Sequence, residues 1–241
     1  MSVTFIDLRR VKRVFVFVVP SLLLVLSIIV GGGELQALRN GIVKDNKPYT
    51  VIIDPGHGGE DPGAVAEDGT LEKDLNLSIS MLIGEGLKEK GIEVVYTRIE
   101  DKMLYSEDQN IKGLRKLSDL KNRVAVAKGV DNPLFISIHM NSYGAKSLSG
   151  LQVFYSPYTG SEELGNGISS SVKASFPSQR KRPLKKGEGI YVLEKAVGPA
   201  VLIECGFITN PEECKKLSQK EFQKELSSAI ICGIIEYMNK K

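Results

Sequence analysis

The chain of 241 residues has few cysteines and histidines and contains no tryptophan. Its three cysteines, Cys205, Cys214 and Cys232, are an odd number and include no C-x-x-C pair. Structural zinc sites and disulfide frameworks use cysteines in pairs at short, regular spacings. The sequence therefore argues against a thiolate zinc site and a disulfide-built fold, and it leaves room for one disulfide at most.

The chain also lacks an excess of positive charge outside its N-terminal part. Residues 1–47 contain seven Lys or Arg and three Asp or Glu, a net of +4, which leaves 25 cationic and 26 anionic residues, a net of −1, in residues 48–241. A domain that binds nucleic acid usually carries a strongly basic surface. We therefore expect no nucleic-acid partner.

A long uncharged apolar run occurs near the N-terminus, at residues 14–30, and four cations precede it in residues 9–13. This pattern is typical of a signal peptide or a membrane anchor whose basic end stays in the cytoplasm. No A-x-A cleavage site follows, so we favour an uncleaved anchor over residues 1–33. With either outcome the rest of the protein is exported, and it is membrane-anchored or secreted.

The remainder of the chain is predicted to be one domain. Residues 34–47 are polar, are interrupted by Asn and Gly, and are expected to form a linker. Residues 48–241 contain no internal repeat, low-complexity tract or second linker, and their length is ordinary for one domain. We therefore expect a single catalytic domain over residues 48–241.

Strand-like and helix-like patterns alternate along this domain. We expect strands at residues 49–54, 92–97, 134–139, 151–155, 191–193 and 201–205. We expect helices at residues 71–90, 118–128, 162–175, 210–217 and 221–238. This order predicts an α/β fold with a mostly parallel central sheet that helices cover on both faces. Ligands bind such sheets where the loops after several strands meet at one edge.

Both histidines of the chain end a strand-like apolar run. His57 follows the first strand in the glycine-rich turn DPGHGG, and His139 ends the third strand. A buried strand that stops at such a turn presents a side chain at the edge of the sheet. A phosphate-binding loop is the alternative, but the turn has neither a Lys-Ser/Thr pair nor a G-x-G-x-x-G run. The two histidines therefore predict a metal site at the sheet edge.

Two glutamates are placed where they can complete this site. Glu72 opens the helix after the His57 turn, and Glu204 lies within the apolar strand at residues 201–205. Two histidines and one carboxylate are a known ligand set of catalytic Zn²⁺, and a second carboxylate serves as general base. We assign Glu204 as the base, because apolar neighbours raise a carboxyl pKa, and His57, Glu72 and His139 as ligands. Taken singly, a glutamate in the first turn of a helix, such as Glu72, is more often a surface residue that complements the helix dipole.

Longer segments around these four residues resemble one protein family. The segments are DPGHGGEDPGA, FISIHMNS and PAVLIECGFITNPEE, with lesser matches at Tyr96–Arg98, Asp101 and Arg123. From about Tyr49 to Met238 the chain is similar to the zinc-dependent N-acetylmuramoyl-L-alanine amidases of the type 3 family. The resemblance implies that His57, Glu72 and His139 bind Zn²⁺, that Glu204 is catalytic, and that the central sheet is twisted and mixed. It also implies cleavage of the amide between N-acetylmuramic acid and L-alanine in peptidoglycan.

Within this family, the layout is most similar to the germination-specific (CwlD-like) amidases of spore-forming bacteria. The chain has an export segment, one domain and no wall-binding repeat. This similarity implies a role in forming the muramic lactam of the spore cortex, with action on a glycan strand and stem peptide outside the cytoplasm, for instance in the forespore intermembrane space. Because residues 151–191 have no long insertion that would plug the site, activation by a partner protein is a further hypothesis.

Three other functions remain open at this stage. The protein is alternatively a general vegetative cell-wall amidase, or a membrane-anchored wall-binding protein without activity. A third hypothesis makes Cys205 the nucleophile and His139 its base. It is disfavoured because a cysteine within an apolar strand is usually an inert small hydrophobe.

Two features have no place in the family resemblance. Residues 180–186 contain five cations, which form either a solvated loop or a contact with anionic groups of the wall. The absence of tryptophan removes the strongest sugar-stacking side chain. The remaining candidates for lining a glycan groove are Tyr143, Tyr155, Tyr158 and Tyr191.

Overall fold

The structure, a computed structural model, describes residues 48–180 and 182–240, which belong to one compact unit. The predicted anchor (residues 1–33) and linker (residues 34–47) lie outside the described residues. Within the described ranges, none of the helices has the length and apolar character that a membrane span requires.

The centre of the domain is a six-stranded sheet in the order β2-β1-β3-β6-β4-β5. Neighbouring strands run parallel from β2 to β6, β4 is antiparallel to β6, and β5 is parallel to β4. The strands are β1 (Thr50–Pro55), β2 (Val94–Tyr96), β3 (Pro133–Asn141), β4 (Gln152–Tyr155), β5 (Lys185–Lys186) and β6 (Ala200–Phe207). The predicted α/β fold with a mostly parallel mixed sheet is confirmed.

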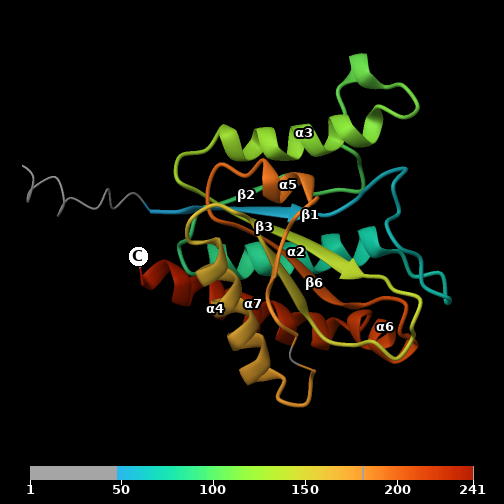
Figure 1. Ribbon diagram of the computed structural model, residues 1–241, viewed down its shortest axis with the longest axis vertical. Coiled ribbons are helices and arrows are strands. Elements are labelled where there is room, and N and C mark those ends of the chain that lie inside the picture. Colours follow the sequence, from blue (N-terminus) through green and yellow to red (C-terminus); the bar gives the residue numbers. More distant parts are fainter. Residues whose placement is uncertain (1–47, 181, 241) are drawn as a thin grey trace, which may run out of the picture. The chain divides into compact units, whose positions relative to one another are not determined.

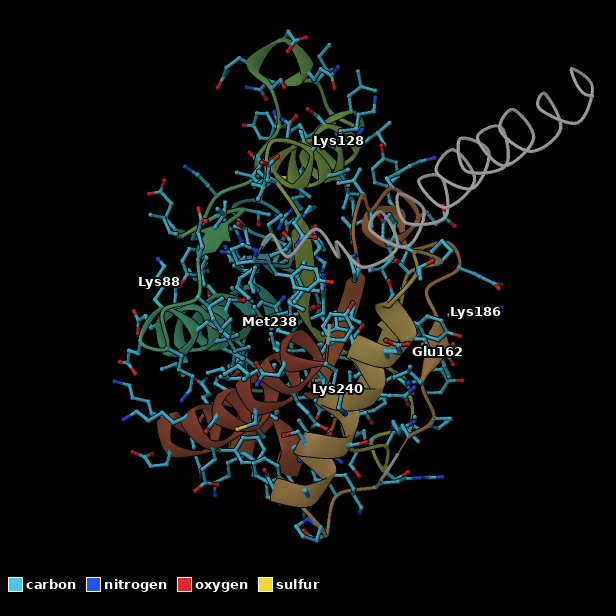
Figure 2. All side chains as sticks on the ribbon, turned by 90° about the vertical axis from the view of Figure 1, so that its left-hand side faces the viewer. Lys88, Lys128, Glu162, Lys186, Met238 and Lys240 are labelled. Carbon is cyan, nitrogen blue, oxygen red and sulfur yellow. The ribbon has the colours of Figure 1, made fainter. Side chains whose placement is uncertain are left out.

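Helices cover both faces of the sheet (Figure 1). One face packs against α2 (Glu72–Lys88), α4 (Ser161–Ser175), α6 (Pro211–Leu217) and α7 (Lys220–Asn239). The other face packs against α3 (Arg115–Lys128) and the short α5 (Tyr191–Glu194), and we call it the α3/α5 face. Figure 2 shows α3, with Lys128, and α7, with Met238, on opposite sides of the sheet.

The alternation of side chains along each strand determines which residues lie on the α3/α5 face at the C-terminal ends of the strands. Ile52, Phe135 and Leu202 belong to the core on this face, whereas their sequence neighbours point into the α2/α7 core. Side chains two residues apart share a face. Asp54, His139 and Glu204 therefore lie on the α3/α5 face, near the C-terminal ends of β1, β3 and β6.

One predicted strand is wrong. Residues 191–193 begin the helix α5, in which the amide of Leu193 donates to the carbonyl of Ile190 at 3.0 Å. An apolar run of three residues carries too little periodicity to separate a strand from one helical turn. Val192 and Leu193 are buried in the core of the α3/α5 face, so tertiary packing decides their conformation.

Some local features were not predicted. The basic segment forms the edge strand β5 over Lys185–Lys186, and a 3₁₀ turn η1 occupies Glu107–Gln109. The segment between β2 and α3 that contains η1 protrudes from the domain at the upper right of Figure 1. All three cysteines are free, so the one disulfide that the sequence allowed does not form.

Candidate metal centre

The loop after β1 holds His57 in an unusual backbone conformation. His57 has φ 59°, in the left-handed region, and Gly58 and Gly59 follow with positive φ. A non-glycine residue pays roughly 1–2 kcal/mol for this conformation, and it persists only where the surroundings enforce it. The conformation turns the chain sharply at the end of β1, so that the imidazole stays at the edge of the sheet.

Two buried arginines bind the carbonyl groups of this loop. Arg123 Nη2 donates to the carbonyl of His57 at 2.7 Å and its Nη1 to that of Pro55 at 2.7 Å. Arg98 donates to the carbonyls of Pro55 and Gly56, each at 2.9 Å. These donors supply hydrogen bonds to carbonyl groups that a neighbouring strand would otherwise bind, and they hold the loop in place.

The same guanidinium of Arg123 is part of a buried ion network. It contacts Asp54 Oδ1 at 2.7 Å and Asp119 Oδ2 at 2.7 Å, while Thr97 and Ser137 donate to Asp54 at 2.6 and 2.7 Å. Burial itself raises the pKa of Asp54, but Arg123 and the two hydroxyls outweigh it and hold that pKa below its ordinary value. Asp54 is therefore an ionised structural anchor beneath the site.

The structure brings together the three residues that the sequence predicted as ligands. Glu72 Oε1, at the start of α2, lies 3.3 Å from His57 Nε2 and 3.0 Å from His139 Nδ1. One ligand atom from each residue lies within 4.8 Å of the others, so the group could hold a metal ion. The two imidazole rings stand edge to face with centroids 4.9 Å apart.

Neighbouring groups orient these three side chains. His57 Nδ1 donates to Asp61 Oδ2 at 2.9 Å, which leaves Nε2 facing Glu72. Glu72 accepts from the amides of Ala64 at 2.8 Å and Met140 at 3.0 Å. Such outer partners fix the tautomer and direction of metal ligands, and the donor set fits a cation such as Zn²⁺.

The electrostatics of the group also suit a cation. Burial lowers the pKa of His57, but hydrogen bonds to Asp61 and Glu72 outweigh it and raise the pKa to about 9. Burial raises the pKa of Glu72, yet the two histidines hold that pKa far below its usual range. Without a metal, the carboxylates retain a proton on the imidazole, and a bound cation takes the place of that positive charge.

Two glycines leave the space that these side chains occupy. A Cβ at Gly56 would lie 2.2 Å from the imidazole of His139. A Cβ at Gly63, which has φ 68°, would lie 2.6 Å from Glu72 Oε2 and 2.8 Å from His57 Cδ2. The glycines of the DPGHGGEDPGA segment therefore have a steric role in this site.

Glu204 lies directly beside the ligand group. It is opposite His139 in the β3–β6 register, and its Oε2 is buried without a hydrogen-bond partner. Burial raises the pKa of Glu204 to about 7, helped by the charge of Glu72 and opposed by the two histidines. This carboxyl group can thus accept and release a proton near neutral pH.

A bulge in β6 follows Glu204, and sequence reasoning missed the residue that fixes it. His139 pairs with Glu204 and Asn141 with Phe207, so β6 has one extra residue between the two pairs. The carboxylate of Glu213 accepts from the amides of Phe207 and Gly150, both at 2.8 Å. Bulges of this kind redirect side chains next to active sites. In the sequence, Glu213 is recognisable only as an acidic residue after the N-cap Asn210, and this pattern by itself predicts only the start of a helix.

A pocket of about 200 Å³ adjoins both candidate histidines. Leu120 of α3, Ile190 and Val192 near α5, and Leu202 of β6 supply apolar walls. Tyr191, one of the candidates for lining a glycan groove, also lines this pocket.

The other candidate tyrosines lie elsewhere. Tyr155 and Tyr158 line a separate pocket of about 510 Å³ with Glu162 and Lys186, both labelled in Figure 2. Tyr155 is opposite Val201, near the start of β6 and so away from Glu204. Tyr143 is exposed on the loop after β3.

The cysteine hypothesis does not fit the geometry. Cys205 points into the α2/α7 core, on the face of the sheet opposite to His139, and is buried. Burial, with nearby carboxylates, raises the pKa of the Cys205 thiol far above its ordinary value. Cys205 is therefore an inert core residue.

Comparisons with known proteins indicate the family of the chain. Residues 51–236 match the family model of N-acetylmuramoyl-L-alanine amidase (Amidase_3). The germination-specific N-acetylmuramoyl-L-alanine amidase of Bacillus subtilis (strain 168) is 34% identical over 192 residues, which cover 79% of this chain and 80% of the relative.

Solved structures show the same relationship. The CwlD amidase from Clostridioides difficile, determined in complex with the GerS lipoprotein, has a TM-score of 0.77 and 35% identity and covers 81% of this chain and 100% of its own. The amidase AmiC2 of Nostoc punctiforme has a TM-score of 0.69 and 31% identity, with coverage of 80% and 97%. The chain therefore belongs to the N-acetylmuramoyl-L-alanine amidase family, and it is a hydrolase that acts on peptidoglycan.

Proposed function

We propose that His57, Glu72 and His139 bind Zn²⁺ and that Glu204 is the catalytic base for hydrolysis of the amide between N-acetylmuramic acid and L-alanine. One observation carries this proposal. Three ligand atoms from different elements converge within 4.8 Å, and the unpartnered Oε2 of Glu204 is buried beside them. Each ligand has the residue type that catalytic zinc sites use.

The residues of this chain have distinct tasks in the reaction. When bound, Zn²⁺ supplies a Lewis acid that polarises a carbonyl oxygen and acidifies water. Glu204 takes the proton of the attacking water on its carboxylate and then delivers it to the nitrogen of the departing L-alanine. Its pKa of about 7 suits both transfers, because a catalytic group works best when its pKa is near the operating pH.

Asp61 and the two buried arginines keep His57 in place during these transfers. Asp61 holds Nδ1 of the imidazole, and Arg98 and Arg123 hold the loop carbonyls. A displacement of about 1 Å at an active site can cost about a hundredfold in rate. The rigid mounting of the loop is therefore part of the proposed mechanism.

We assign the biological role from the relatives and the sequence together. The role is amide cleavage before muramic lactam formation in the spore cortex, which is supported by the germination-specific relative. Residues 48–241 are the catalytic domain, residues 34–47 the linker and residues 1–33 the anchor, so the enzyme works outside the cytoplasm. Activation by a partner protein is supported by the CwlD structure, which contains the GerS lipoprotein.

The decisive experiment is product analysis of spore and vegetative peptidoglycan digested with the purified enzyme. Free stem peptides, lost on chelation and restored by Zn²⁺, are expected from spore peptidoglycan. Glu204→Gln should abolish the release while keeping bound zinc, whereas the exposed control Glu221→Gln should not change it. Release of sugars or shorter peptides contradicts the amidase mechanism, and equal activity on vegetative wall favours a general cell-wall amidase.

The partner hypothesis has its own measurement. The purified enzyme should cleave slowly by itself and faster when a partner protein from the same cells is added. Full activity of the isolated domain, residues 48–241, would contradict the need for a partner. A protein that binds peptidoglycan and zinc but releases nothing under any condition would be a wall-binding protein.

A further inference from the structure

The apolar pocket of about 200 Å³ beside the candidate metal ligands is suited to a small part of the substrate. His57 and His139 line one side, and Leu120, Ile190 and Leu202 line the others. Sites for drug-sized ligands measure about 300–1,000 Å³, so a sugar with its substituents is too large for this one. A short apolar group next to the scissile bond fits it better.

Most charged groups of the pocket are already paired. Asp54, Asp119 and Arg123 line its inner end, and each aspartate pairs with the guanidinium of Arg123 at 2.7 Å. They are buried and therefore have little capacity for a ligand. The pocket offers its recognition groups at the outer rim instead.

Lys116 lies at this rim and, unlike the buried charged groups, is exposed to solvent. Its Nζ lies 3.6 Å from Asp61 Oδ2, which is longer than a hydrogen bond, and its side chain is 68% exposed. The ammonium group can therefore turn to a carboxylate that enters the pocket mouth. Lys116 is the second residue of α3, after Arg115, and Leu120, one turn later on this helix, lies in the apolar wall.

We propose that this pocket receives the L-alanine of the stem peptide and that Lys116 binds the carboxylate of the acidic residue that follows it. This inference rests on the proposed amidase function. The methyl group of alanine suits the apolar walls of the pocket. The acidic residue that follows alanine in the stem peptide would then lie at the rim, where Lys116 supplies a positive charge.

The contact should determine specificity without taking part in proton transfer. A contact between an exposed lysine and a carboxylate is weak, and it corresponds to an effect of at most about fivefold on kcat/KM. Because Lys116 also lies near Asp61, which orients His57, its substitution could act on the metal site itself. The test must therefore separate recognition of the substrate from support of His57.

The experiment uses two matched muropeptides that differ only at the second stem residue, one with free glutamate and one with the amidated isoglutamine. Wild-type enzyme should cleave the free acid about threefold to fivefold more efficiently. Lys116→Met should lose this preference by slowing the acid substrate alone, and Lys116→Arg should retain it. The control is Lys121→Met, an exposed lysine of the same helix that does not line the pocket and should behave as wild type.

The possible results are distinct. Equal slowing of both substrates in Lys116→Met, or no change in either, overturns the recognition role. A wild-type enzyme without any preference also overturns it. Failure of the wild-type enzyme to release stem peptide from either muropeptide overturns the proposed amidase function instead.

Discussion

Replacement of Arg123 by methionine should strongly destabilise the protein. Methionine keeps an unbranched apolar stem but removes a guanidinium that contacts Asp54, Asp119 and two loop carbonyls at 2.7 Å. Arg123 and Asp54 are only 2% and 1% exposed, so the substitution leaves a buried carboxylate without its cation. Breaking a buried ion pair in this way costs about 3–5 kcal/mol.

Urea unfolding measures this effect directly. With a slope of about 2 kcal/mol per molar urea, the midpoint should fall by about 1.5–2.5 M. The matched control is Arg115→Met on the same helix, because Arg115 pairs with the exposed Glu60. Pairs at the surface contribute about 0–1 kcal/mol, so the midpoint of the control should move by less than about 0.5 M.

A double-mutant cycle tests the physical reason. The double variant Asp54→Asn, Arg123→Met removes both charges and should cost less than the sum of the single variants by about 1–3 kcal/mol. Costs that add within about 0.5 kcal/mol would refute the argument, because they would mean that the two groups do not stabilise each other.

Three further predictions concern pH, the loop glycine and the β6 bulge. Because folding lowers the pKa of Asp54, its contribution to stability is present above about pH 4 and is lost as the pH falls through its folded pKa. Acid unfolding of the Asp54→Asn variant should lack this loss. An acid profile equal to that of the wild type would contradict the assignment. Gly56→Ala should reduce bound zinc and activity at least tenfold, since its Cβ would lie 2.2 Å from the imidazole of His139. The control Gly144→Ala, with open space around its Cβ, should keep the zinc content and the activity of the wild type. Glu213→Ala leaves two buried amides unpaired and should lower the free energy of unfolding by about 2–4 kcal/mol. The control Glu212→Ala, at an exposed position, should change the free energy of unfolding by less than about 0.5 kcal/mol. Equal effects of the two variants in thermal unfolding would exclude a role for the buried carboxylate.

The sequence was informative where the chemistry is local. His57 and His139 end strands whose apolar runs are visible in the sequence, and parallel strands of one sheet end at a common edge. The approach of both histidines to Glu72 therefore followed from element order and strand direction. The raised pKa of Glu204 likewise followed from its apolar neighbours on one strand, because desolvation by those neighbours is the largest cause of the shift.

The support of the site depends on residues far apart in the sequence. Asp54 and Arg123 are 69 residues apart, and Glu213 bonds to the amide of Gly150 across 63 residues. No local pattern indicates which buried acid meets which donor. The sequence marked Arg123 as a family match, but its contact with the His57 carbonyl is visible only in the folded chain.

The sequence by itself determined the fold class, the four candidate site residues and the elements that carry them. These features follow from periodicity and from the positions of glycine, histidine and glutamate along the chain. Tertiary structure alone decided that residues 191–193 form a helix, that Cys205 faces away from His139, and that Lys116 reaches the rim of the pocket. The reason is that short segments and surface side chains carry little local signal, so that packing against distant residues sets their conformation and their neighbours.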